Sequence, residues 1–301
     1  MIKALYEYPR KLKTEGKKWK LIYKINKLIA VTVFPVLALF QNNKGTDTNG
    51  EIIVSLTSFP ARINKVWITI STILNQSLKP KRVLLWLAEE QFPNKEKDLP
   101  KSLLKLKNRG LEILFCDDLK SHKKYYYTMK DNPDDIVVTV DDDMLYPENM
   151  LQQLWNSHNT NPECVVCQFA HMITFDENGS INPYKKWLSC YGDDTKPNMR
   201  ILPVGCGGVL YPPGVLNKSL FDKEKINNLC PQMDDLWLKA MAILNKTKAV
   251  ICNKGSLIYF DMTGTRKSGL QHVNAGQNKN DDAMKAILQE YPELMSILKN
   301  N

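Results

Sequence analysis

Apolar runs alternate along the chain with segments whose apolar residues follow helical spacing. Runs of strand length occur at 51–56, 81–87, 111–116 and 136–140. The segments 66–76 and 99–109 have an apolar helical face, and the second ends at Gly110. Strands and helices that alternate with short connections predict an α/β fold, in which a mostly parallel sheet is covered by helices on both faces.

The second half of the chain has a less regular pattern. The apolar run at 165–173 predicts another strand, and the turn-rich segment 176–200 predicts a flap. The glycine-rich stretch 204–214 would let a ligand approach the backbone. Further helices are predicted at 233–244 and 281–299.

The predicted strand at 136–140 runs directly into three carboxylates, Asp141, Asp142 and Asp143. Carboxylates at the end of a buried strand need a cation or a hydrogen-bond network to compensate their charge. Ligands of an α/β sheet bind in the crevice at the carboxyl ends of its strands. Adjacent carboxylates suit Mg²⁺ or Mn²⁺, which shares its coordination with substrate phosphates. The pattern favours a metal and diphosphate site, and the alternative is a solvated acidic turn.

Positive charge is concentrated near the start of the chain. Residues 1–28 contain nine Lys or Arg against two Glu, which is +7 of the net +9. The remaining +2 forms no basic stripe, so we expect no nucleic-acid partner. Seven cysteines without a disulfide framework favour a reducing, cytoplasmic compartment.

Residues 1–40 are predicted to form a basic amphipathic extension. Apolar residues in 21–29 follow helical spacing, with lysines on another face. The apolar stretch 28–40 is interrupted by Pro35 and falls short of the roughly 20 residues that cross a bilayer. We therefore expect either an in-plane anchor at the inner face of the cell membrane or a helix packed on the main domain.

Two enzyme classes with carboxylates at a strand end fit less well. A phosphatase of the haloacid-dehalogenase type needs a later acidic motif, for which Gly192-Asp193-Asp194 is a poor substitute. A sugar nucleotidyltransferase needs a glycine-rich loop after its first strand, where this chain has Thr57-Ser58-Phe59-Pro60. Neither class accounts for the arrangement of motifs.

A third class matches several stretches in order. They are 55–62 after the first strand, Asp118 with Lys124 six residues on, 133–147 around the carboxylates, the turn 205–208, and Asp234-Asp235-Leu236-Trp237. Over roughly residues 51–290 the chain resembles nucleotide-sugar-dependent glycosyltransferases of the GT-A fold. In particular, it is similar to the bacterial family-2-like enzymes that build capsular polysaccharide or lipopolysaccharide chains.

The resemblance implies a nucleotide-sugar donor and a divalent cation, Mn²⁺ or Mg²⁺. Asp143 would be the direct metal ligand, with Asp141 and, from a closing loop, His272 as further candidates. The residues expected to contact the nucleotide are Thr57, Pro60, Arg62, Asp118, Lys124, Asp141 and Asp142.

The acceptor hydroxyl needs a general base. The resemblance implies that Asp235 is the base of an inverting transfer and that Asp234 orients the base or the acceptor. Related enzymes often have Glu-Asp at this point, and capping of the helix N-terminus is the alternative role for the pair. Trp187 is a candidate platform for the acceptor.

The implied function is metal-dependent transfer of a sugar, from a uridine-diphosphate donor by preference, to a glycan or lipid-linked acceptor in cell-surface polysaccharide biosynthesis. The polar stretch 41–50 would link the extension to a catalytic domain at 51–301, whose nucleotide half is 51–150 and whose acceptor half is 151–301. The alternative is a non-catalytic module that binds nucleotide sugars or a membrane surface and holds a structural cation. A second acidic pair argues against such a module, because a binder needs no base.

Overall fold

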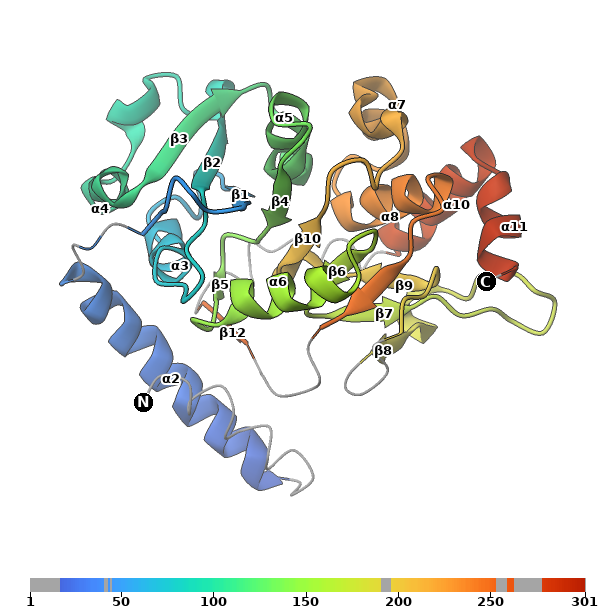
Figure 1. Cartoon of the computed structure of the whole chain (residues 1–301), viewed down its shortest axis with the longest axis horizontal. Coiled ribbons are helices and arrows are strands. Elements are labelled where there is room, and N and C mark those ends of the chain that lie inside the picture. Colours follow the sequence, from blue (N-terminus) through green and yellow to red (C-terminus); the bar gives the residue numbers. More distant parts are fainter. Residues whose placement is uncertain are drawn as a thin grey trace.

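The computed structural model describes residues 17–40, 43, 45–190, 196–252, 259–262 and 278–300. Its central feature is a seven-stranded sheet (Figure 1). In spatial order the strands are β11 (Ala249–Ile251), β6 (Val165–Cys167), β10 (Val209–Tyr211), β4 (Ile136–Thr139), β1 (Ile52–Thr57), β2 (Arg82–Ala88) and β3 (Leu111–Cys116).

Pairing in this sheet is mostly parallel. Strand β1 is parallel to β2 and β4, β2 is parallel to β3, and β11 is parallel to β6. Strand β10 runs antiparallel to its neighbours β4 and β6. The parallel strands bring their carboxyl ends to one edge of the sheet, and the predicted α/β fold is confirmed.

Helices cover both faces because the strands alternate their side chains between the faces. Val54 and Leu56 of β1 share one apolar core with Ile70 of α3 (Val66–Ile73). Ser55 points to the other face, where its Oγ lies 2.7 Å from Thr128 Oγ1 of α5 (Lys123–Asp131). Each face of β1 therefore has its own helix.

The second half of the chain builds another apolar core, around α8 (Asp234–Leu244). The predicted strand at 165–173 is wrong in extent. It ends as β6 at Cys167 and resumes as β7 (Ala170–Met172), which pairs with β8 (Leu188–Cys190) and β9 (Ile201–Pro203) in a separate sheet. The apolar run continues through both strands, so it does not reveal the change of partner.

Two predicted helices are interrupted. The segment 99–109 forms α4 (Lys101–Leu104) and a 3₁₀ turn, η3 (Lys105–Arg109), which Gly110 ends with a φ of 106°. The final helix divides into α10 (Lys279–Glu290) and α11 (Glu293–Lys299) around Pro292, which lacks a backbone N–H. The other helices of the main domain are α6 (Met150–Thr160) and α7 (Lys223–Leu229). The remaining 3₁₀ turns are η1 (Glu89–Gln91), η2 (Lys95–Asp98), η4 (Lys120–His122), η5 (Tyr184–Lys186), η6 (Gly205–Gly207) and η7 (Lys218–Phe221).

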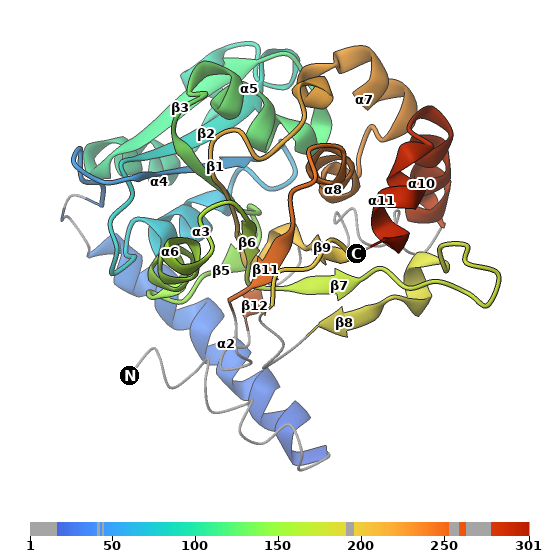
Figure 2. The same cartoon turned by 45° about the vertical axis from the view of Figure 1, so that its right-hand side comes forward.

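The N-terminal extension forms one continuous helix, α2 (Lys17–Leu39), which runs through Pro35. The part at Lys20–Ala38 is long and apolar enough, by length and composition alone, to cross a membrane. The prediction that the apolar stretch 28–40 is too short to cross a bilayer is therefore wrong about the length of the helix. The basic turns and the apolar stretch form a single helix. Figures 1 and 2 show α2 lying along one side of the domain, where it contacts α3.

Candidate active site

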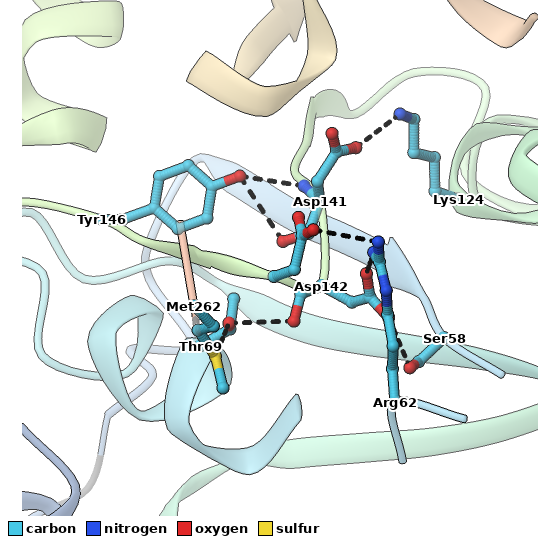
Figure 3. Close-up of polar contacts among 9 residues, drawn as sticks. Ser58, Arg62, Thr69, Lys124, Asp141, Asp142, Tyr146 and Met262 are labelled. Carbon is cyan, nitrogen blue, oxygen red and sulfur yellow. Dashed lines mark hydrogen bonds and ion pairs between the residues drawn. The ribbon is translucent and has the colours of Figure 1, made fainter. Parts of the chain in front are cut away.

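Asp142 is turned into the protein at the end of β4. Ser58 Oγ donates a hydrogen bond to Asp142 Oδ2 at 2.6 Å, and Arg62 Nη1 donates to Asp142 Oδ1 at 2.5 Å (Figure 3). Thr69 Oγ1 donates to the backbone carbonyl of Asp142 at 3.0 Å. Burial raises the pKa of Asp142, and the positive charge of Arg62 opposes this rise. Asp142 thus fastens the loop between β1 and α3 to the end of β4.

Asp141 and Asp143 keep more access to solvent, with side chains 32% and 19% exposed. Arg62 Nη2 lies 3.0 Å from Asp143 Oδ2. The backbone N–H of Met262 donates to the Asp143 carbonyl at 2.8 Å, and the backbone N–H of Asp141 donates to the Tyr146 hydroxyl at 2.9 Å. The backbone is therefore fixed on both sides of the motif, while its outer carboxylates remain accessible.

A buried lysine joins this strand end to the second acidic pair. Lys124 of α5 places its Nζ 2.8 Å from Asp141 Oδ1 and 2.7 Å from Asp234 Oδ2 at the start of α8. Burial disfavours the charge on Lys124 and on Asp234, but their attraction outweighs this cost. The pKa of Lys124 is raised and the pKa of Asp234 is lowered, so both groups stay ionised.

Asp235 lies beside Asp234 but has a different environment. Its Oδ2 accepts a hydrogen bond from the backbone N–H of Gly205 at 3.1 Å. Burial, together with the negative charge of Asp234, raises the pKa of Asp235 to about 7. Asp235 is therefore the acid of this pair that is poised to exchange a proton near neutral pH, whereas Asp234 is committed to Lys124.

Gly205, in η6, lies where the charged groups of three elements converge. A Cβ at this position would lie 2.8 Å from Lys124 Nζ, 3.0 Å from Asp235 Oδ1 and 3.4 Å from Asp141 Oδ1. The sequence predicts close approach of a ligand to this glycine-rich turn. The structure shows that charged side chains of the protein already approach it closely.

Three other residues expected at the nucleotide lie at or just after the strand ends, and two of them have protein partners. Thr57 ends β1, and its Oγ1 donates to a backbone carbonyl of β2 at 2.8 Å. Pro60 is exposed in the following loop. Asp118 follows β3, and its buried carboxylate is paired with Lys123 and, at 2.6 Å, with Lys120. Their contacts to a nucleotide stay predictions, as do those of Arg62, Lys124, Asp141 and Asp142.

Trp187 is not available as a platform for an acceptor. Its side chain is buried in the second core, and its Nε1 donates to the Asn182 carbonyl at 2.7 Å. The ring of Tyr184 lies 5.0 Å from that of Trp187 and is less buried. Burial raises the pKa of Tyr184, and the negative charge of the nearby Asp235 adds to the effect.

Sequence reasoning missed Tyr184 and the partners of the carboxylates, Ser58 and Tyr146. Ser58 lies in the loop after the first strand, and Tyr146 follows the carboxylates by only three residues, so both were within recognised motifs. Their hydrogen bonds depend on how distant segments meet. Tyr184 carried no signal beyond being an aromatic residue in a turn-rich segment.

The fit of this site to a divalent cation depends on its accessible carboxylates. Among the described residues no group of three or more His, Cys, Asp or Glu side chains is arranged to hold a metal, and His272 lies outside them. Mg²⁺ is commonly bound by one or two carboxylates together with substrate phosphates. Asp141 and Asp143 fit that arrangement, in which the metal binds with a diphosphate.

Comparison with known proteins identifies the fold. No family model and no curated protein matches the chain. Among solved structures, the S. aureus TarS fragment 1–349 is 13% identical, with a TM-score of 0.44 over 79% of this chain and 70% of that one. The mannosyltransferase PcManGT from Pyrobaculum calidifontis, solved with GDP-Man and Mn²⁺, is 11% identical, with a TM-score of 0.50 over 91% of this chain and 78% of that one. The second likeness shows that the chain has a glycosyltransferase fold of the GT-A type.

Proposed function

We propose that this protein is a glycosyltransferase, which transfers a sugar from a nucleoside-diphosphate donor to a hydroxyl group of a glycan or lipid-linked acceptor. One observation carries the proposal. Lys124 contacts both Asp141, at the end of β4, and Asp234, beside Asp235. Sugar transfer needs stabilisation of a leaving diphosphate and activation of an acceptor, and the two acidic motifs supply residues for both tasks.

Asp235 is the proposed general base. Its carboxylate takes the proton of the acceptor hydroxyl, and the hydroxyl oxygen forms a bond to the anomeric carbon of the donor sugar. The bond between that carbon and the diphosphate oxygen breaks, and its electron pair leaves with the diphosphate. This single displacement inverts the anomeric configuration. A pKa of about 7 suits Asp235 to proton uptake at neutral pH.

The leaving diphosphate would meet positive charge at the strand end. Asp143 and Asp141 would hold Mn²⁺ or Mg²⁺, which when bound supplies positive charge to the departing oxygen. Arg62 is held in place by Asp142 and Asp143 and adds a fixed guanidinium. Asp234 keeps Lys124 charged and in position between the two motifs.

The finer part of the proposal follows the sequence resemblance. We expect a role in cell-surface polysaccharide biosynthesis at the inner face of the membrane, with a uridine-diphosphate sugar as preferred donor. Because the comparison mannosyltransferase was solved with GDP-Man and Mn²⁺, guanosine-diphosphate sugars belong in the same test.

The test is a screen of uridine- and guanosine-diphosphate sugars with and without Mn²⁺, in which thermal stability and release of the nucleoside diphosphate are both measured. A bound donor raises the melting temperature, and the increase grows with the logarithm of the donor concentration relative to its Kd. We expect one donor to stabilise the protein and to be turned over slowly by water, and faster with an acceptor. Stabilisation without turnover by any acceptor would instead support a non-catalytic nucleotide-sugar module.

A further inference from the structure

Helix α2 has one face packed on the main domain. Ala30 is fully buried, and the ring of Tyr23 lies 5.4 Å from the ring of Phe260. Lys27 Nζ forms an ion pair with Asp261 Oδ1 at 2.7 Å, with both side chains largely buried. These contacts recur every three or four residues, as expected for one face of a helix.

The opposite face of α2 is apolar and exposed. Its large side chains are Leu21, Ile25, Leu28, Ile29, Val36 and Phe40, which we call the outer face. Thr32 lies among them, and its hydroxyl donates to the Leu28 carbonyl at 2.9 Å, so this polar group is satisfied within the helix. A row of exposed apolar residues along a helix marks an interaction surface, whereas single exposed ones are ordinary.

The positive charge beside the outer face indicates which kind of partner this surface binds. Lys20 and Lys24 are exposed between the two faces, and residues 1–28 carry +7 in total. A helix with an exposed apolar face and a lysine-rich flank suits a surface of anionic lipids. We propose that the outer face of α2 docks in the plane of an anionic membrane while the inner face stays on the catalytic domain.

Two other arrangements fit these contacts less well. If α2 crossed the bilayer, Lys24 and Lys27 would enter the hydrocarbon region and the ion pair of Lys27 with Asp261 would be broken. If the outer face instead paired with a second copy of the chain, the added basic charge would be repelled by that of the copy. Docking in the plane keeps the inner contacts and uses the lysines.

The packed face of α2 contacts a strand that lies beside the acidic strand end. Asp261 belongs to β12 (Phe260–Asp261), which pairs with β5 (Met144–Leu145), so that Asp261 lies opposite Met144, next to Asp143. The backbone N–H of Met262 reaches the Asp143 carbonyl. Docking would therefore hold the site beside the membrane, which favours a lipid-linked acceptor; this last step rests on the proposed function.

Sedimentation of the full chain with vesicles tests the docking surface. We expect binding to vesicles of phosphatidylcholine with 30% phosphatidylglycerol, much weaker binding to phosphatidylcholine alone, and at least tenfold weaker binding of the Leu21→Glu/Leu28→Glu variant. The matched control is Leu188→Glu on β8, because Leu188 is as exposed as Leu21, at 62%. Unchanged binding of the double variant, or an equal loss in the control, would overturn the proposal, as would a dimer that the double variant abolishes.

A second measurement separates docking from crossing. In a Lys27→Cys/Asp261→Cys variant, a short bismaleimide would join α2 to β12. We expect the joined protein to bind anionic vesicles as well as the unjoined one; loss of binding would mean that α2 must leave the domain. Donor turnover in solution is measured on the same samples, so failure of docking and failure of the transferase assignment remain distinguishable.

Discussion

Lys124 Nζ lies 2.7 Å from Asp234 Oδ2, and this buried ion pair gives two neighbouring acids different environments. Asp234 compensates the charge of Lys124, which also contacts Asp141 at 2.8 Å. Asp235 accepts a hydrogen bond from a backbone N–H instead of contacting a cation, and its pKa is raised. A pair of carboxylates whose environments push their pKa values apart is the arrangement expected of a positioning group and a base.

Replacing Asp235, the proposed base, should separate donor binding from sugar transfer. We expect Asp235→Asn to lower the transfer rate by on the order of 10²- to 10⁴-fold, the range of a general base, while the melting-temperature increase caused by donor is retained. Asp234→Asn is the comparison: it leaves Lys124 with one carboxylate fewer, so we expect lower stability and a smaller loss of rate. A larger loss of rate in Asp234→Asn than in Asp235→Asn would reverse the assignment of the two acids.

The pKa of Asp235 predicts the pH dependence of transfer. If Asp235 is the base as proposed, it must be ionised to act, so the rate should rise with pH through an inflection near 7. Stability should change in the opposite direction. The folded state keeps the Asp235 proton to about pH 7, whereas the unfolded state loses it near the ordinary value of 3.8, so this group lowers stability as pH rises from about 4 to 7. Rate profiles and melting temperatures over pH 5–9 would check both trends, and Asp235→Asn should flatten them.

Arg62 should contribute to stability as well as to donor binding. Its guanidinium pairs with the buried Asp142, and removing one partner of a buried pair typically costs about 3–5 kcal/mol. We expect Arg62→Met to show a loss of that order in urea unfolding and to weaken donor binding. Arg82→Met is the control, because the guanidinium of Arg82 also pairs with a carboxylate, that of Glu112, but at the surface, where such pairs contribute roughly 0–1 kcal/mol. Equal losses in both variants would contradict the structural role of Arg62.

Gly205 should tolerate no side chain. The Cβ of Gly205→Ala would displace Lys124 or Asp235, and a misplacement of about 1 Å can cost on the order of 100-fold in rate. Gly214→Ala is the control: Gly214 has open space around it but a φ of 75°, so that variant should lose stability without losing rate per folded molecule. A Gly205→Ala enzyme with normal kcat and pH profile would show that the charged cluster can shift without consequence.

The acidic site could be predicted from the sequence because its chemistry is local. A β-branched strand that ends in three carboxylates, and an apolar helix that opens with two, are visible without knowing what they touch. What could not be predicted are the pairings between distant segments. The inward turn of Asp142 depends on Ser58 and Arg62, some 80 residues earlier, and no local pattern encodes which carboxylate of a triplet meets them.

The same limit explains why the strand predicted at 165–173 and the helix predicted in the N-terminal extension differ from the structure. The apolar run at 165–173 continues while its partners change from β10 and β11 to β8 and β9, because buried strands of either sheet need the same residues. The pattern predicts too short a helix in place of α2, because the lysines in 21–29 and Pro35 in 28–40 indicate two separate segments. A proline within a helix is tolerated when neighbouring packing holds the helix together, and the packing of Phe34 on the main core supplies it here.

Lys239 offers a test of the second core that does not involve the active site. Its side chain is buried in α8, and among the described residues its Nζ has no hydrogen-bond partner. Burial lowers the pKa of Lys239 to about 7 from the ordinary 10.5, so the folded state gives up a proton that the unfolded state keeps. This group therefore lowers stability most below about pH 7, and the penalty fades as pH rises toward 10.5.

We expect Lys239→Met to raise the free energy of unfolding by about 1–3 kcal/mol at pH 6, because it replaces an unsatisfied buried amine with an apolar side chain of similar length. The gain should shrink as the pH approaches 10. Lys248→Met is the control, because Lys248 is exposed after the same helix and its loss should stay within about 0.5 kcal/mol. Urea unfolding at several pH values measures both variants. A Lys239→Met protein that is less stable at pH 6 would show that the amine has a partner which the packing of α8 conceals.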